Sequence, residues 1–210
     1  MKAYSLCSMI ISMSDIICIT NRKLCDGDFF ERIDDIARQK PKAIVLREKD
    51  MSETGYDALA KKVTGICKKY DVPCILHSFY NVADNLETNA IHLPLRLLRQ
   101  MNESKRASYK KIGTSCHSIA DAIEAEKCGC TYIIAGHIFA TDCKKGVPPR
   151  GIDFLSDVCR AVEIPVYAIG GINKDNIVSV RQAGAAGGCI MSGLMICSDV
   201  QSLMEDFQNE

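Results

Sequence analysis

The sequence contains no tryptophan, only six prolines, and no tract rich in proline, glycine or serine that would divide it into domains. No stretch reaches the roughly 18 consecutive apolar residues that a membrane-spanning helix requires, so we expect no membrane span. The sequence also lacks an excess of charge of either sign, because 26 Lys and Arg residues balance 26 Asp and Glu residues. Such a chain has no net field that would attract nucleic acid or an anionic membrane surface. We therefore predict a small-molecule ligand.

The twelve cysteines do not form a metal-binding pattern. Cys128 and Cys130 have no second cluster at zinc-ligand spacing, so we expect no structural metal. Most of the other cysteines lie in apolar stretches, as Cys18, Cys74, Cys116 and Cys189 do. This placement is typical of buried thiols in a reducing compartment rather than of disulfides. We predict a cytoplasmic protein.

Residues 1–14 precede the first predicted strand and are interpreted as an N-terminal extension. Serines interrupt their apolar run and no convincing cleavage site follows, which argues against a signal peptide. An alternative is that translation starts at Met9 or Met13. Residues 15–210 are assigned to one domain, because a chain of 210 residues that is 47% hydrophobic can bury one sizeable core but not two ordinary ones.

Predicted strands and helices alternate along the whole chain. Short runs rich in β-branched residues predict strands at 16–20, 43–48, 73–78, 90–93, 111–116, 132–139, 166–171 and 187–192. Helical periodicity predicts helices at 29–40, 53–70, 119–127, 154–162, 174–183 and 200–207, and the segments 81–86 and 95–101 leave room only for short ones. Apolar strands separated by amphipathic helices indicate a parallel sheet, and eight such units favour a (β/α)₈ TIM barrel. A doubly wound open sheet is the alternative.

In such a barrel the active site lies on the loops that follow the strands. Polar residues and glycines are found at or just after the predicted strand ends, and we expect them to share one mouth of the barrel. They are Arg47, Lys49, His77, Ser115, His117, His137, Thr141, Lys144, Gly170, Gly171, Met191, Ser192 and Gly193.

The loops after the last two predicted strands are candidate phosphate sites. Gly170 and Gly171 end one strand, and Met191, Ser192 and Gly193 end the next. Glycine lets backbone N–H groups approach a phosphate closely, and a following helix directs its positive end toward the anion. The alternative is that these glycines only form tight turns.

His137 is the candidate catalytic residue, because an imidazole can take or give a proton near neutrality. The alternative is a packed or hydrogen-bonded histidine. Thr141 and Lys144 follow in the same loop, where Lys144 either neutralises an anion or lies on a solvated surface. Phe139 is expected to help enclose the pocket.

Arg47 and Lys49 alternate along one strand end and are predicted to face the same anionic group. A surface ion-pair network is the alternative. Of the other histidines, His117 is assigned a supporting structural role and His92 a place in the core or at the rim, while the role of His77 stays open.

The chain resembles the thiamine-phosphate synthase/TenI family of barrels from Ile16 onward. The segments that resemble it are 19–22, 46–49, 91–93, 112–118, 136–146 and 164–172, and the last two together are strongly specific. The resemblance implies a TIM barrel that binds a phosphorylated thiazole, and by analogy a homodimer.

Two activities share this family, and the resemblance is closer to the thiazole tautomerase branch. Synthases join a pyrimidine diphosphate to a thiazole phosphate using Mg²⁺, held by carboxylates after strands 3 and 4. The matching positions, His77–Ser78 and 95–97, contain no carboxylate. Synthases also usually have Gly-Pro where this chain has Gly136 and His137, and in the tautomerase branch this histidine is the proposed acid and base.

The resemblance therefore implies a metal-free aromatisation of a carboxythiazole phosphate. One alternative is a thiamine-phosphate synthase with displaced Mg²⁺ ligands. Another, suggested by the missing carboxylates, is a catalytically silent barrel that binds a thiamine intermediate and regulates other proteins.

Overall fold

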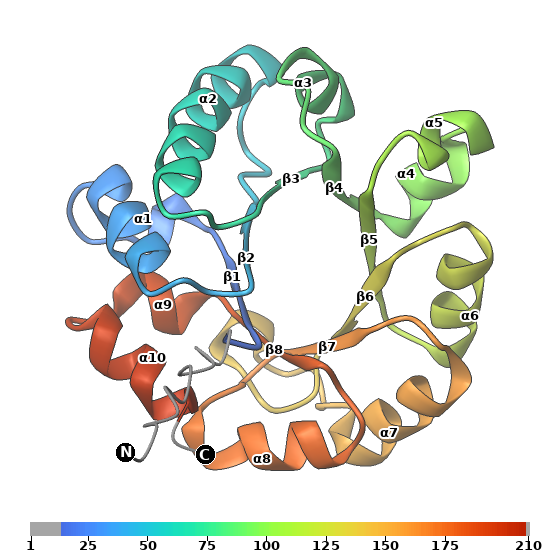
Figure 1. Cartoon of the computed structure of the whole chain (residues 1–210). Coiled ribbons are helices and arrows are strands. Elements are labelled where there is room, and N and C mark those ends of the chain that lie inside the picture. The colour runs from blue at the N-terminus through green and yellow to red at the C-terminus, as the bar shows by residue number, and fades with distance from the viewer. Residues whose placement is uncertain (1–13, 209–210) are drawn as a thin grey trace, which may run out of the picture.

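The computed structural model describes residues 14–208, which form a closed barrel of eight parallel strands surrounded by helices (Figure 1). The strands follow one another around the barrel in chain order, and β1 pairs with both β2 and β8. This confirms the predicted (β/α)₈ barrel and excludes the open sheet. Of the expected extension, only Ser14 lies within the described residues, and its hydroxyl accepts a hydrogen bond from the N–H of Ile16 at 3.1 Å.

The strands are β1 (Ile16–Ile19), β2 (Ala43–Leu46), β3 (Cys74–His77), β4 (Ala90–Pro94), β5 (Lys111–Cys116), β6 (Tyr132–Gly136), β7 (Val166–Ile169) and β8 (Gly187–Ile190). The helices are α1 (Phe29–Arg38), α2 (Glu53–Lys69), α3 (Tyr80–Asn85), α4 (Leu95–Gln100), α5 (Glu103–Ala107), α6 (Ile119–Lys127), α7 (Gly151–Ala161), α8 (Lys174–Gln182), α9 (Ser192–Ile196) and α10 (Val200–Gln208). Two short 3₁₀ helices, η1 (Arg22–Leu24) and η2 (Asp142–Lys144), lie in the loops after β1 and β6. Within the described residues, no helix has the length and apolar character needed to cross a membrane.

Several helices begin at a capping side chain, which sets where the preceding loop ends. The Asp28 carboxylate accepts hydrogen bonds from two N–H groups at the start of α1, and the Ser52 hydroxyl accepts one from Gly55 at the start of α2. Asn173 and Asn176 form a reciprocal capping box at the start of α8. Because these caps satisfy backbone donors that the helix itself leaves free, they stabilise the junctions next to the barrel mouth.

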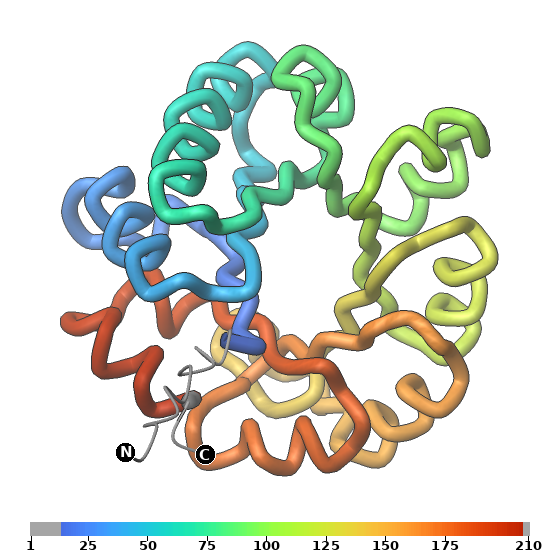
Figure 2. The backbone as a smooth tube through the Cα atoms, in the orientation of Figure 1, coloured from blue at the N-terminus to red at the C-terminus, as the bar shows by residue number. Residues whose placement is uncertain are grey.

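Figure 2 shows the chain going once around the barrel, from β1 in blue to the last helices in red beside α1. Each strand and the helix after it lie next to the preceding pair, as expected for right-handed βαβ units. The cysteines that the structure describes are all free thiols, and Cys18, Cys116 and Cys189 are buried.

Alternation along the strands separates two apolar layers. In β2, Ile44 and Leu46 face the helices and belong to the large outer core, whereas Ala43 and Val45 belong to a smaller cluster inside the barrel. Since successive side chains of a strand point to opposite faces, the next odd-numbered position, Arg47, also faces inward. The inward-facing residues of β2 therefore end with the Arg47 side chain at the mouth of the barrel.

Candidate active site

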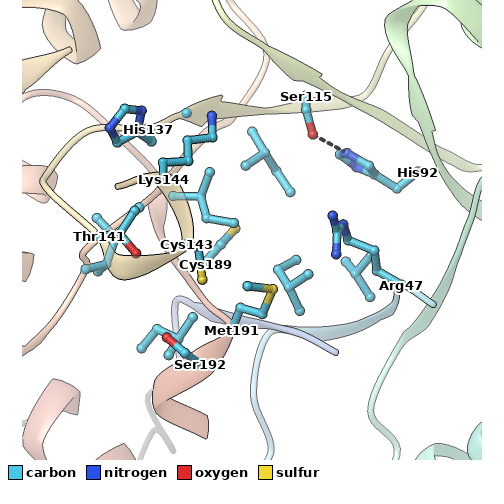
Figure 3. A pocket seen from close by; sticks show the side chains of 18 of the residues that line it. Arg47, His92, Ser115, His137, Thr141, Cys143, Lys144, Cys189, Met191 and Ser192 are labelled. Carbon is cyan, nitrogen blue, oxygen red and sulfur yellow. Dashed lines mark hydrogen bonds between the residues drawn. The ribbon is translucent and has the colours of Figure 1, made fainter. Parts of the chain in front are cut away.

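A cavity of about 610 Å³ opens at the carboxyl ends of the strands. It is lined by every residue that the sequence placed at the mouth: Arg47, Lys49, His77, Ser115, His117, His137, Thr141, Lys144, Gly170, Gly171, Met191, Ser192 and Gly193. Figure 3 shows Arg47, His92 and Ser115 on one side of it, His137, Thr141 and Lys144 on the opposite side, and Met191 and Ser192 on a third. The structure thus brings the predicted residues together, while their roles stay predictions.

One wall of the cavity is cationic. Arg47 is half-buried, and its guanidinium makes no hydrogen bond or ion pair with the described part of the chain. Burial lowers its pKa, and burial together with repulsion from Arg47, Arg96 and Lys144 lowers the pKa of Lys49. A bound anion would offset both effects, so this wall is suited to a negatively charged group.

Glu48, the residue after Arg47, connects this wall to the residues that follow β1. Its side chain is buried and accepts hydrogen bonds from the Thr20 hydroxyl at 2.7 Å and from Arg22. The Thr20 oxygen in turn accepts the N–H of Arg47 at 2.9 Å. The ion-pair network that was the alternative therefore exists, but it joins Glu48 and Asp50 to Arg22 and Lys23 rather than to Arg47 and Lys49.

Two imidazoles form the floor of the cavity. His77 and His92 are both buried, and their rings stack with centroids 5.6 Å apart. Burial lowers the pKa of His77 to about 2, assisted by repulsion from His92 and Arg47, and lowers that of His92 to about 3. Both rings are therefore neutral at physiological pH. His92 was expected in the core or at the rim, and it both is buried and lines the cavity.

His137 is buried in the opposite wall, with 3% of its surface exposed. Its Nε2 has no hydrogen-bond partner among the described residues, which is uncommon for a buried polar atom. In Figure 3 its ring lies at the margin of the cavity beside Lys144. The imidazole is therefore packed, as the alternative interpretation expects, but its Nε2 has no hydrogen bond within the described chain.

The loop after β7 packs directly against His137. At Gly170, where φ is +104°, an added Cβ would lie 2.6 Å from the Cβ of His137, and at Gly171, where φ is +65°, it would lie 2.4 Å from the carbonyl oxygen of Ala140. Only glycine fits at these two positions. These glycines are thus required by the close packing of the loop, which agrees in part with the alternative that they only form tight turns.

The same loops also offer hydrogen-bond donors to the cavity. Within the described chain, the N–H groups of Gly171, Ser192 and Gly193 have no acceptor. Three free N–H groups around one cavity can hold phosphate oxygens.

His117 has the supporting contacts that the sequence suggested. Its ring Nδ1 donates to the carbonyl oxygen of Gly136 at 3.2 Å, and its backbone N–H donates to Asp121 at 2.9 Å. These contacts connect the loop after β5 to the end of β6, next to His137. Lys144 is exposed, as the solvated-surface alternative expects, although it also lines the cavity.

The expectation for Phe139 was wrong. This side chain packs against the outer core and does not line the cavity. The reason is that β6 ends at Gly136, three residues before the predicted end, and the chain then bends so that the N–H of Phe139 donates to the carbonyl oxygen of Gly170. The apolar lining comes instead from residues such as Ile134, Ile169 and Cys189.

Comparisons with known proteins now identify the family. The family model described as thiamine monophosphate synthase matches residues 16–194. The chain belongs to this family. A thiamine-phosphate synthase of Fusobacterium nucleatum is 31% identical, over 91% of this chain and 94% of its own length, and one of Enterococcus faecalis is 32% identical, over 83% of each. A solved structure of thiamine phosphate pyrophosphorylase from Pyrococcus furiosus superimposes with a TM-score of 0.80 at 28% identity, covering 94% of both chains.

The carboxylates that the resemblance implied for a Mg²⁺ site are missing from this chain. His77 and Ser78 follow β3 and residues 95–97 follow β4, so no carboxylate is available at either position. Asp121 is the one acidic residue that lines the cavity in the described chain, and its Oδ2 already accepts the N–H of His117. Nor do the described residues contain a cluster of three or more His, Cys, Asp or Glu side chains suited to a metal ion. The side chains present do not fit Mg²⁺, which prefers carboxylate oxygens.

Proposed function

We propose that this chain is a thiamine-biosynthesis enzyme that aromatises a carboxythiazole phosphate, with His137 transferring the proton. The observation that supports this most is the buried, unpartnered Nε2 of His137, a residue that lines the cavity and whose Cβ packs at Gly170. A proton-transfer group and a prospective phosphate-binding loop are therefore adjacent.

The reaction moves one proton and loses no atoms. A neutral His137 imidazole takes the proton from the ring carbon, and the resulting imidazolium delivers a proton to the exocyclic carbon as the ring becomes aromatic. The free N–H groups of Gly171, Ser192 and Gly193 would hold the phosphate, and the cationic wall would face the carboxylate. Positioned acid/base catalysis of this kind typically contributes about 10²- to 10⁴-fold.

A second candidate is thiamine-phosphate synthase, and the names of the relatives favour it. This reaction would join a pyrimidine diphosphate to a thiazole phosphate in the same cavity. The absence of carboxylates at His77, Ser78 and residues 95–97 argues against it.

Two parallel incubations separate the candidates. In the first, the carboxythiazole tautomer is mixed with the protein in EDTA and followed by ultraviolet absorbance. In the second, hydroxymethylpyrimidine diphosphate and thiazole phosphate are supplied with Mg²⁺, and thiamine phosphate is measured. We expect turnover only in the first. Thiamine phosphate formation that EDTA abolishes would establish the synthase instead, and tight binding of thiazole phosphate without either turnover would indicate a regulatory binding protein.

A further inference from the structure

A row of hydrogen-bonded side chains runs beneath Ser115. The Tyr132 hydroxyl lies 3.0 Å from Nδ1 of His92. Nε2 of His92 lies 3.0 Å from Oγ of Ser115, the bond that is dashed in Figure 3. The three residues come from β6, β4 and β5, which pair side by side in the barrel. Tyr132 and His92 are buried, and His92 and Ser115 line the cavity.

The barrel makes room for this arrangement at one position. Gly113 pairs with Tyr132 across β5 and β6, and a Cβ added at Gly113 would lie 2.2 Å from Cζ of the tyrosine ring. A side chain at residue 113 would therefore displace the ring from His92. The fold thus reserves the space that keeps the tyrosine hydroxyl on the imidazole.

The direction of the two hydrogen bonds follows from what each group can donate. Burial raises the pKa of Tyr132 well above its usual range, so the hydroxyl keeps its proton, and the pKa of His92 is about 3, so its ring has a single N–H. Nδ1 of His92 is the one acceptor available to the Tyr132 hydroxyl in the described structure. If Nδ1 held the hydrogen, a buried donor would have no partner, which costs about 1–3 kcal/mol.

Tyr132 therefore donates to Nδ1, and Nε2–H donates to the oxygen of Ser115. The hydrogen of Ser115 has no acceptor in the described chain and is left for the cavity. In Figure 3 the Arg47 guanidinium lies on the same side, beside His92. An O–H donor and an unpaired guanidinium that line the same cavity are together suited to a carboxylate.

We propose that Tyr132 and His92 are positioning residues that hold Ser115 as a hydrogen-bond donor, and that Ser115 with Arg47 receives the carboxylate of the bound thiazole. This inference rests on the proposed function for the identity of the ligand. It adds to that function a device that recognises the carboxylated ring.

The test compares two probes by calorimetry: the aromatic carboxythiazole phosphate and the same thiazole phosphate without its carboxylate. Neither requires turnover. We expect Ser115→Ala to weaken binding of the carboxylated probe by about 10-fold or more, the value for a hydrogen bond to a charged group. Tyr132→Phe should weaken it by about 3- to 10-fold, because the imidazole can then accept from Ser115. In both variants the affinity for the second probe should change less than about twofold.

Tyr167→Phe is the matched control, since Tyr167 packs edge-on against Tyr132 inside the barrel but has no hydroxyl contact with His92. It should leave both affinities unchanged. Equal weakening of both probes, or an unchanged preference in Ser115→Ala, would overturn the proposal, and Ser115→Ala decides the matter even if Tyr132→Phe does not fold. If the probe preference depends on Ser115 but the protein has no tautomerase activity, the proposed function fails and this inference stands. If the protein has tautomerase activity but the probe preference does not depend on Ser115, this inference fails and the proposed function stands.

Discussion

The buried pair His77 and His92 should make the fold sensitive to mild acid. Their pKa values in the folded protein, about 2 and about 3, lie far below the value near 6.5 of an unfolded histidine. The unfolded chain therefore binds protons that the folded barrel rejects as the pH falls below about 6.5. The stability associated with these rings is present above that pH and is lost progressively as the pH falls toward their folded pKa values.

The expected magnitude follows from this shift. Between about pH 7 and about pH 5, each histidine that stays neutral in the fold lowers the free energy of unfolding by about 2 kcal/mol, and the pair by about 4 kcal/mol. That is a large part of the stability of an ordinary domain, about 5–15 kcal/mol. Carboxylates with a lowered pKa, such as Asp50, titrate mainly below this window.

Urea unfolding followed by circular dichroism at the two pH values measures this difference. In His77→Asn, about 2 kcal/mol of the loss should disappear. Tyr167→Phe is the control, because it changes another residue inside the barrel without removing a group that titrates in this range. If wild type and His77→Asn lose the same free energy between the two pH values, the reasoning about the buried pair is refuted.

Two further substitutions test Glu48 and the glycine loop. Glu48→Gln removes the charge from a buried carboxylate that accepts hydrogen bonds from Thr20 and Arg22. It should lower the free energy of unfolding by about 2–4 kcal/mol in the same urea assay. A loss below about 0.5 kcal/mol would contradict a supporting role for Glu48. Gly171→Ala places a Cβ 2.4 Å from the carbonyl oxygen of Ala140, at a residue whose φ is positive. It should weaken the binding of thiazole phosphate by about 10-fold or more. Unchanged affinity by calorimetry in a folded Gly171→Ala protein would show that this loop does not bind the phosphate.

The repeating parts of the fold were predictable because they depend on local pattern. The predicted segments 111–116 and 119–127 match β5 and α6 to the residue, since β-branched runs and helical periodicity are strong there. The mouth was equally predictable, because strand alternation alone directs residues such as Arg47 and Ser115 toward one end of the barrel. Short helices such as α5 and α9, each of five residues, were not predicted because they span little more than one turn.

The connections within the site were not predictable. His92 lies in an apolar strand and looks like a core residue, and its partners are 40 and 23 residues away in sequence, so only the pairing of β4, β5 and β6 brings them together. The hydrogen bond between the buried Glu48 and Thr20, which follows the neighbouring strand β1, likewise joins residues 28 positions apart in sequence. Phe139 was misplaced because strand periodicity was extended past Gly136, where the chain bends. The homodimer and the cytoplasmic location stay predictions.

The most direct test of the account is the rate of tautomerisation in His137→Ala, measured beside the affinity of the same protein for the aromatic carboxythiazole phosphate. The account predicts that the rate falls by about 10²- to 10⁴-fold while the affinity changes little, because the phosphate and carboxylate contacts lie on other residues. A His137→Ala protein that converts the tautomer at the wild-type rate would contradict it.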